Sequence, residues 1–172
     1  MYFGLFPVIP YDANGDGTVS LVTNLMKRVR LRANVKKELT LLQGYPVQDG
    51  ETPEMVADKH HGNSSYHWIV MLMNNIIDPY HDWPKSLRQM QLYLKDKYGS
   101  SQFDVHHYEI YQSSGDTTIP IEVDNVSYPN ATPITNYDHE HKLNEAKREI
   151  DLLDNRYTSI FVDEFTQLIS KN

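Results

Sequence analysis

The chain has 172 residues, a net charge of −7 at pH 7, 40% hydrophobic residues and no cysteine. This length fits one domain, or one core with an appendage, and the apolar content is enough for a buried core. The acidic balance argues against general nucleic-acid binding, and the lack of cysteine excludes disulfides and thiolate chemistry.

The first segment, residues 1–44, is predicted to contain an extended arm followed by a helix. It opens without the basic and long apolar regions of a signal peptide, and we predict no transmembrane helix and no membrane partner. The arm, Tyr2–Tyr11, is apolar, but Pro7 and Pro10 limit strand pairing. We therefore expect the arm to lie across a neighbouring protein and not in the chain's own core. The helix is expected over residues 20–32.

A polar turn separates the arm from that helix. The residues from Asp12 to Gly17 match the first half of a calcium-binding loop, in which oxygen ligands alternate along the chain before a glycine. The twelfth position is Thr23, which cannot supply the bidentate carboxylate of a complete loop. We therefore interpret the segment as a turn rich in Asn, Asp and Gly, and we expect no bound calcium.

The second segment, residues 45–99, is predicted to begin with a strand and to end with a helix. The strand is expected over residues 39–47. The closing helix is expected to open at Pro84, because proline suits the first helical position, and to stop at Gly99.

Two shorter helices are predicted between them. Thr52 is a suitable N-cap, Pro53 suits the first position of a helix, and Gly62 is a suitable helix end. The next helix runs through Met73 and is apolar nearly all round, so it is expected to be buried, with Trp68 in the core.

The third segment, residues 100–172, is predicted to contain a β-hairpin, a loop and two helices. The alternation of apolar residues and the turn chemistry define their bounds. The predicted order is a strand at 103–111, a strand at 117–123, a loop at 124–137, and helices at 138–150 and 155–170.

The block from Glu51 to Pro84 reads ETPEMVADKHHGNSSYHWIVMLMNNIIDPYHDWP. It resembles the LysM-like segment of a baseplate wedge protein family of contractile-tailed, T-even-like bacteriophages. The resemblance extends to LVTNLMKRVRLR early in the chain and to TNYDHEHKLNEAKREIDLL near its end. It implies an α+β fold, with a small LysM-like βααβ core, an N-terminal arm and helix, a β-hairpin and C-terminal helices.

The same resemblance implies a structural role without catalytic turnover. The protein would be a subunit of a contractile-tail baseplate wedge, present in multiple copies per virion and assembled in the cytoplasm of the bacterial host. It would bind other wedge subunits and help to clamp neighbouring wedges around the hub. No cofactor and no nucleic-acid partner are expected.

The candidates for partner contacts are aromatic residues, arginines and one leucine of the apolar arm, all outside the two short helices, because aromatic residues and arginine are enriched at protein interfaces. Arg28 and Arg30 belong to a basic cluster between residues 27 and 37. Phosphate binding, protein docking and a solvated helix face are all adequate explanations of this cluster. The candidates are Tyr2, Phe3, Leu5, Phe6, Tyr80, Trp83, Arg28, Arg30, Tyr128 and Tyr137.

The histidines occur in close groups, which raises the question of a metal site. Zinc needs three or four convergent ligands. Adjacent residues of a strand point to opposite faces, so His106 and His107 are not expected to bind one ion together. His60 and His67 could converge across the turn at Gly62, but no third ligand is evident. We therefore predict no metal site.

Catalytic motifs are absent from the sequence. It contains no GxSxG, GxGxxG or P-loop pattern, so we predict that the protein is not an enzyme. Two alternatives stay open. One is a LysM-type peptidoglycan-binding protein, although the strand that usually follows the second helix is not apparent after Asn74. The other is a tail-associated lytic enzyme.

Overall fold

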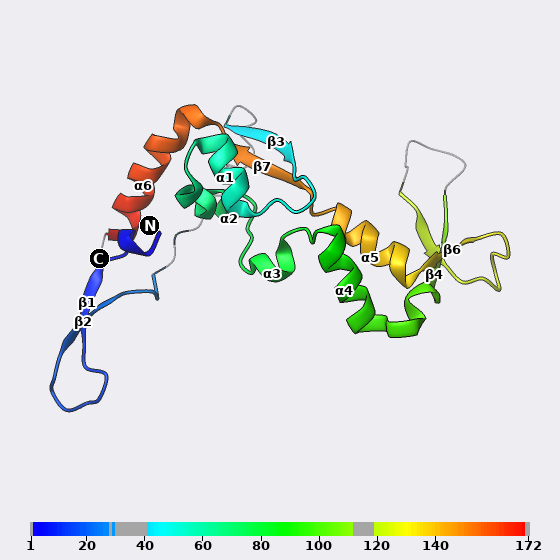
Figure 1. The fold of residues 1–172 in the computed structure, drawn as a ribbon, viewed down its shortest axis with the longest axis horizontal. Helices are drawn as coiled ribbons and strands as arrows, with labels where there is room; N and C mark the ends of the chain where they lie inside the picture. The colour runs from blue at the N-terminus through cyan, green and yellow to red at the C-terminus, as the bar shows by residue number, and fades with distance from the viewer. Residues whose placement is uncertain (1, 28, 30–40, 112–118, 171–172) are drawn as a thin grey trace. The chain divides into compact units, whose positions relative to one another are not determined.

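The computed structural model describes residues 2–27, 29, 41–111 and 119–170, and it belongs to the expected α+β class (Figure 1). Within these residues the strands form three small antiparallel sheets, with the strand orders β1–β2, β3–β7 and β5–β4–β6. The chain divides into two compact units. Unit 1 comprises residues 1–47, 51–83 and 149–172, and unit 2 comprises residues 48–50 and 84–148. These units cut across the three segments inferred from the sequence.

The elements follow one another in a mixed order of strands, α-helices and short 3₁₀ helices (η). They are η1 Tyr2–Leu5, β1 Val8–Tyr11, β2 Ser20–Thr23, β3 Leu42–Pro46, α1 Pro53–His61, η3 Ser64–Tyr66, α2 His67–Met73, α3 Pro79–Asp82, α4 Leu87–Tyr98, η4 Gly99–Phe103, β4 Val105–Ile110, β5 Ile121–Val123, β6 Thr132–Thr135, α5 Asn136–Glu145, β7 Glu149–Leu153, η5 Asn155–Tyr157 and α6 Thr158–Ser170.

The centre of unit 1 is an antiparallel strand pair with two helices between the strands in the sequence. β3 pairs with β7 from Leu42↔Leu153 to Pro46↔Glu149. The order β3–α1–α2–β7 is the β-α-α-β order expected here, but α3 and residues 84–148 lie between α2 and β7. This insertion explains why no second strand is apparent directly after α2. The specific likeness to LysM stays a prediction.

Local sequence explains the bounds of α1 and α2. The Thr52 hydroxyl accepts a hydrogen bond from the Met55 N–H at 3.4 Å, and Pro53 is the first helical residue. Gly62 ends α1 with a φ of 69°, a left-handed conformation that glycine adopts without strain. Asn63 then caps η3, which leads directly into α2. The two predicted helices are confirmed.

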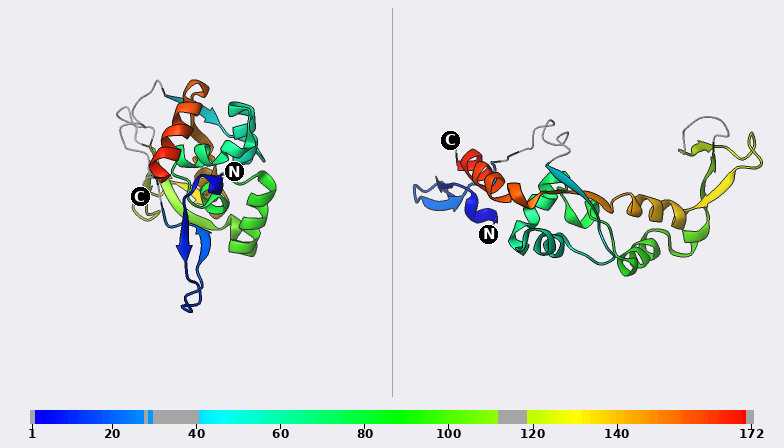
Figure 2. Two further views of the ribbon diagram at one scale, coloured as in Figure 1. Left: turned by 90° about the vertical axis from the view of Figure 1, so that its left-hand side faces the viewer. Right: turned by 90° about the horizontal axis from the view of Figure 1, so that it is seen from above.

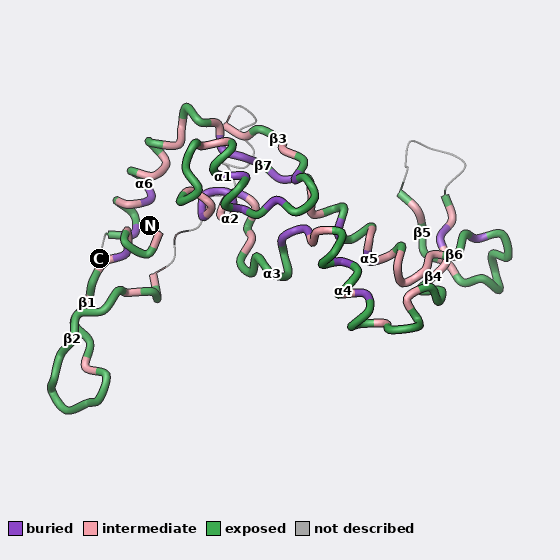
Figure 3. Tube along the Cα trace, in the orientation of Figure 1, coloured by how far each residue is buried: buried purple, intermediate pink, exposed green. Residues whose placement is uncertain are grey.

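The core of unit 1 is built around Trp68 on α2. This side chain is 5% exposed, and its ring centroid lies 4.5 Å from that of Phe165 on α6. Leu153 brings β7 into the same cluster, so the core joins elements that are far apart in sequence (Figure 3). A second cluster is formed by Val47, Val56, Ala57, Val70, Trp83, Ile150 and Leu152.

Three N-terminal residues add to this core, so the expectation that the arm packs outside it is wrong for Tyr2, Leu5 and Phe6. Phe6 is 8% exposed and belongs to the Trp68 cluster. The ring centroid of Tyr2 lies 5.4 Å from that of Trp68. η1 lies beside α6 in each of the views (Figures 1 and 2). Pro7 does not prevent this packing, because the segment before it is a 3₁₀ turn and needs no strand partner.

The predicted helix over residues 20–32 is wrong at its start, where the chain forms β2. β2 pairs with β1 in an antiparallel hairpin, with Val8 opposite Thr23 and Pro10 opposite Leu21. The β-branched residues of β2 favour a strand, and an exposed two-stranded hairpin tolerates the proline. Residues 24–27 are not helical, and residues 28 and 30–32 lie outside the described residues.

In unit 2, α4 begins at Leu87 and not at Pro84. The Ser86 hydroxyl accepts the Gln89 N–H while the Gln89 side chain accepts the Ser86 N–H, and this reciprocal cap fixes the start of the helix. Gly99 ends the helix as predicted, and Met90 and Leu94 are buried on its inner face.

The sheet of unit 2 contains the predicted hairpin and one strand more. β4 and β5 pair with Tyr108 opposite Val123; the connection predicted at residues 113–116 lies outside the described residues. The additional strand, β6, falls within the predicted loop and pairs with the other edge of β4. Pro133 opposite Tyr108 suits this edge position, since proline cannot donate to a neighbouring strand.

The charged stretch after β6 is shorter as a helix than predicted. α5 begins at Asn136, with Thr135 and Asp138 forming a reciprocal cap, and it ends at Glu145. Residues 149–153 are strand β7, in which Ile150 and Leu152 are buried. Pairing with β3 therefore outweighs the local helical tendency of this stretch. The last predicted helix is confirmed as η5 and α6.

Two buried carboxylates connect α5 to its neighbours within unit 2. Glu109 on β4 accepts hydrogen bonds from Lys142 at 2.7 Å and from His107 at 3.1 Å. The Lys142 ammonium, followed by His107, holds the pKa of Glu109 below its usual value despite burial. Burial alone would raise the pKa of Glu140, but hydrogen bonds from Lys97 and Tyr98 on α4 outweigh it and lower this pKa.

Trp68→Ala is expected to destabilise the chain by about 3–5 kcal/mol, because it removes a large buried ring from the centre of the unit 1 core. Denaturant unfolding followed by circular dichroism measures this loss. Tyr80→Ala, an exposed aromatic residue of the same unit, is the control and should stay close to wild type. Equal stability of Trp68→Ala and wild type would show that α2 is not packed as described.

Lys142→Met is expected to raise the pKa of Glu109, since burial then acts against the charged form with less compensation. In the wild type, the carboxylate stabilises the fold fully above its usual pKa of 4.5, and this contribution is lost as the pH falls through the lowered pKa. The variant should therefore have a lower melting temperature than the wild type at neutral pH. The difference between the two melting temperatures should narrow toward about pH 3.

Melting temperatures across this pH range provide the measurement. Lys95→Met, which removes an exposed ammonium group on α4, is the control. A difference between Lys142→Met and wild type that does not change with pH would contradict the assigned role of the ion pair.

Candidate functional site

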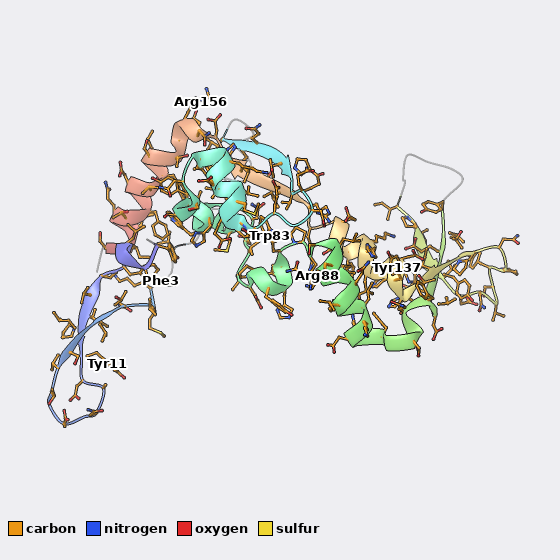
Figure 4. All side chains as sticks on the ribbon, in the orientation of Figure 1. Phe3, Tyr11, Trp83, Arg88, Tyr137 and Arg156 are labelled. Atoms are coloured by element: carbon orange, nitrogen blue, oxygen red, sulfur yellow. The ribbon has the colours of Figure 1, made fainter. Side chains whose placement is uncertain are left out.

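The predicted partner-contact residues divide into exposed and buried groups. Phe3, Tyr80 and Tyr128 are exposed, whereas Tyr2, Leu5 and Tyr137 are half-buried. Phe3 and Tyr137 are labelled among the side chains in Figure 4. Their role in partner binding stays a prediction. Arg28 and Arg30 lie outside the described residues.

Phe6 and Trp83 are core residues, which corrects their assignment as surface contacts. Trp83 is 7% exposed, and its indole N–H donates to the Glu51 carbonyl at 2.7 Å. The bond satisfies the one polar group of the buried ring, so Trp83 fastens the end of α3 to the start of α1. The sequence motif DWP shows an aromatic residue but carries no signal of its burial.

The β1–β2 hairpin carries several exposed apolar side chains. All four residues of β2 are exposed, and Leu21 is 77% exposed. On β1 and in the loop, Val8, Tyr11 and Val19 are exposed as well. The β1 side of the hairpin belongs to the arm that is expected to contact a partner, whereas the β2 side is hidden by the wrong prediction of a helix over residues 20–32.

The loop of this hairpin has a defined structure. The Asp12 carboxylate accepts hydrogen bonds from the N–H groups of Gly15 at 2.7 Å and Gly17 at 2.9 Å, and also from Asn14. These bonds, that from Gly17 first, hold the pKa of Asp12 below its usual value. The turn interpretation of the segment is therefore confirmed, and the hairpin's loop is organised by its own side chains.

Unit 2 carries a second set of exposed apolar side chains. The three-stranded sheet and its adjoining loops leave large side chains open to solvent. These are Phe103, Val105, Tyr111, Ile119, Ile121, Val126 and Tyr128.

Three histidines of unit 2 converge, which overturns the argument that adjacent histidines of this strand must point apart. His106 and His107 on β4 and His139 on α5 each place a ring nitrogen so that the three atoms lie within 4.8 Å of one another. The pairing of β4 with β6 is irregular between Val105 and His107. A bulge breaks the two-residue alternation of side chains, and this is the physical reason for the convergence.

The rings of this group are closely packed. The Nδ1 atoms of His106 and His107 are 2.8 Å apart, and the rings of His106 and His139 stack with centroids 4.0 Å apart. Burial, followed by the neighbouring His106, lowers the pKa of His139 and so favours its neutral form. Neutral imidazoles at this spacing can share protons or bind a metal ion.

The histidines of unit 1 have separate partners. His60 Nε2 lies 2.9 Å from the Leu153 carbonyl oxygen, and His67 Nδ1 lies 3.0 Å from that of Ser64. His61 Nδ1 lies 3.0 Å from the Thr158 hydroxyl. The His60 and His61 contacts tie α1 to β7 and α6, and the His67 contact closes the turn that leads into α2.

Among the helices in the described part of the chain, none combines the length and the apolar character needed to cross a bilayer. No curated protein matches the chain. The model of the family described as base plate wedge protein 53 matches residues 1–162, which includes all of unit 2 and most of unit 1. The chain therefore belongs to the base plate wedge protein 53 family, and its role is that of a structural protein of the phage tail baseplate, in contact with other baseplate components.

Proposed function

We propose that the protein is a wedge subunit that binds other wedge proteins and helps to clamp adjacent wedges around the hub of a contractile tail. The observation that carries the proposal is the exposed β1–β2 hairpin. A two-stranded hairpin is marginally stable in water unless its apolar side chains are covered. A partner subunit that covers Leu21 and its neighbours would supply this burial.

The apolar surface of unit 2 supports the clamping part of the proposal. A clamp must hold two partners, and each of the two units presents an exposed apolar surface of its own. Large exposed apolar patches are typical of protein–protein contacts. The partners proposed here are other wedge subunits and neighbouring wedges, in multiple copies per virion, with assembly in the host cytoplasm.

The proposal assigns no catalytic role and no nucleic-acid partner. The order β3–α1–α2–β7 favours one alternative, a LysM-type peptidoglycan-binding protein. A pull-down of the purified chain with insoluble cell wall distinguishes a wedge subunit from a peptidoglycan-binding protein. Retention of the chain by the cell wall supports peptidoglycan binding. Zymography on peptidoglycan tests for a lytic enzyme, since clearing of the peptidoglycan would support lytic activity.

Leu21→Asp is expected to lower incorporation into wedges at least tenfold, equivalent to ~1.4 kcal/mol of binding free energy, because it places a charge in a surface that must be desolvated. Incorporation is measured by co-expression with the other wedge proteins of the same phage, followed by sedimentation. The isolated variant should fold like wild type, since Leu21 is 77% exposed.

Ile77→Asp provides a matched control, because Ile77 is 87% exposed and lies between α2 and α3, away from both proposed surfaces in sequence. It should enter wedges at the wild-type level. Normal incorporation of Leu21→Asp would exclude the hairpin as a wedge contact.

A further inference from the structure

We propose that His106, His107 and His139 form a binding site for a divalent metal ion of the zinc class. The site lies wholly within unit 2, with two ligands from β4 and one from the first turns of α5. The bulge in β4 places both strand histidines on the side from which His139 approaches. β6 leads directly into α5 through the Thr135 cap, and this connection brings His139 to the strand.

The spacing of the nitrogen atoms suits a tetrahedral ion. Zinc–nitrogen bonds of about 2.0–2.1 Å place two ligand nitrogens roughly 3.3 Å apart in a tetrahedron. The Nδ1 atoms of His106 and His107 are 2.8 Å apart, and the three ligand nitrogens all lie within 4.8 Å of one another. The tetrahedral spacing falls between these two distances. Small rotations of the rings, of which that of His106 is exposed on one side, would close the difference.

Glu109 prepares His107 to act as a ligand. A carboxylate accepts, so the Nε2–H of His107 donates to Glu109, and in the neutral ring the Nδ1 atom that faces His106 carries a lone pair. A carboxylate on the second ring nitrogen is the usual companion of a metal-binding histidine. Lys142 bonds the same Glu109 oxygen at 2.7 Å and keeps the carboxylate in place.

The ligand set identifies the class of ion. Three imidazoles and no thiolate suit zinc, nickel and copper, whereas calcium and magnesium take oxygen ligands. Three protein ligands leave a fourth position for water or for a group of another molecule. An ion here would join β4 to α5 and so stabilise a sheet whose strands are only three to six residues long.

The test uses the full chain without a polyhistidine tag, stripped of metal by a chelator. Titration with Co²⁺, followed by the visible absorption of the bound ion, and competition with Zn²⁺ give the stoichiometry and the relative affinity. We expect one ion per chain and a rise in melting temperature on adding Zn²⁺, because the ion binds the folded state.

His106→Ala and His139→Ala should each weaken binding at least tenfold, and Glu109→Gln should weaken it about 10–100-fold through the orientation of His107. Circular dichroism confirms that each variant is folded, and the exposed position of His106 makes its variant the most conservative of the three. His81→Ala, which removes an exposed histidine of unit 1, should bind like wild type.

The absence of a stoichiometric ion in the wild type would overturn the proposal and leave a group of proton-sharing imidazoles. Unchanged binding in the double variant His106→Ala/His139→Ala would overturn it as well, because the ion would then lie elsewhere. Both measurements use the isolated chain, so their outcome is independent of incorporation into wedges.

Discussion

The pairing of β3 with β7 is the constraint on which unit 1 depends. These strands are far apart in sequence, yet their register runs from Leu42↔Leu153 to Pro46↔Glu149 and closes the β-α-α-β arrangement. Asn74 reinforces it: its side-chain amide donates to the Asp151 carbonyl at 2.8 Å, and its oxygen accepts the Asp151 N–H at 2.8 Å. The end of α2 is therefore fixed to β7, and Leu153 enters the cluster of Trp68 and Phe165.

The same constraint separates what the sequence could predict from what it could not. α1, α4 and α6 were predicted because caps, glycine ends and apolar spacing are local signals. β2, β6 and β7 were missed, since their partners are distant or their residues also suit a loop or helix. The residues of β7 follow a charged helix without a clear break, and only pairing with β3 makes them a strand.

The candidate sites show a similar division. The aromatic character of Phe6 and Trp83 is plain in the sequence, but their burial depends on tertiary packing. The convergence of the histidines depends on a single irregularity of β4 that breaks a two-residue alternation. Sequence patterns assume regular strands, so a bulge is invisible to them, and the prediction that His106 and His107 diverge failed for that reason.

The discontinuity of unit 1 bears on how the protein forms during translation. β3, α1 and α2 are synthesised well before β7 and Phe165. Trp68 and its apolar neighbours therefore lack their packing partners while unit 2 is being synthesised. Unit 2 is nearly continuous in sequence and can fold in that interval. Long-range pairing is slow to form, and the waiting apolar helix is open to wrong association. Slower translation through residues 84–148 would lengthen this exposure.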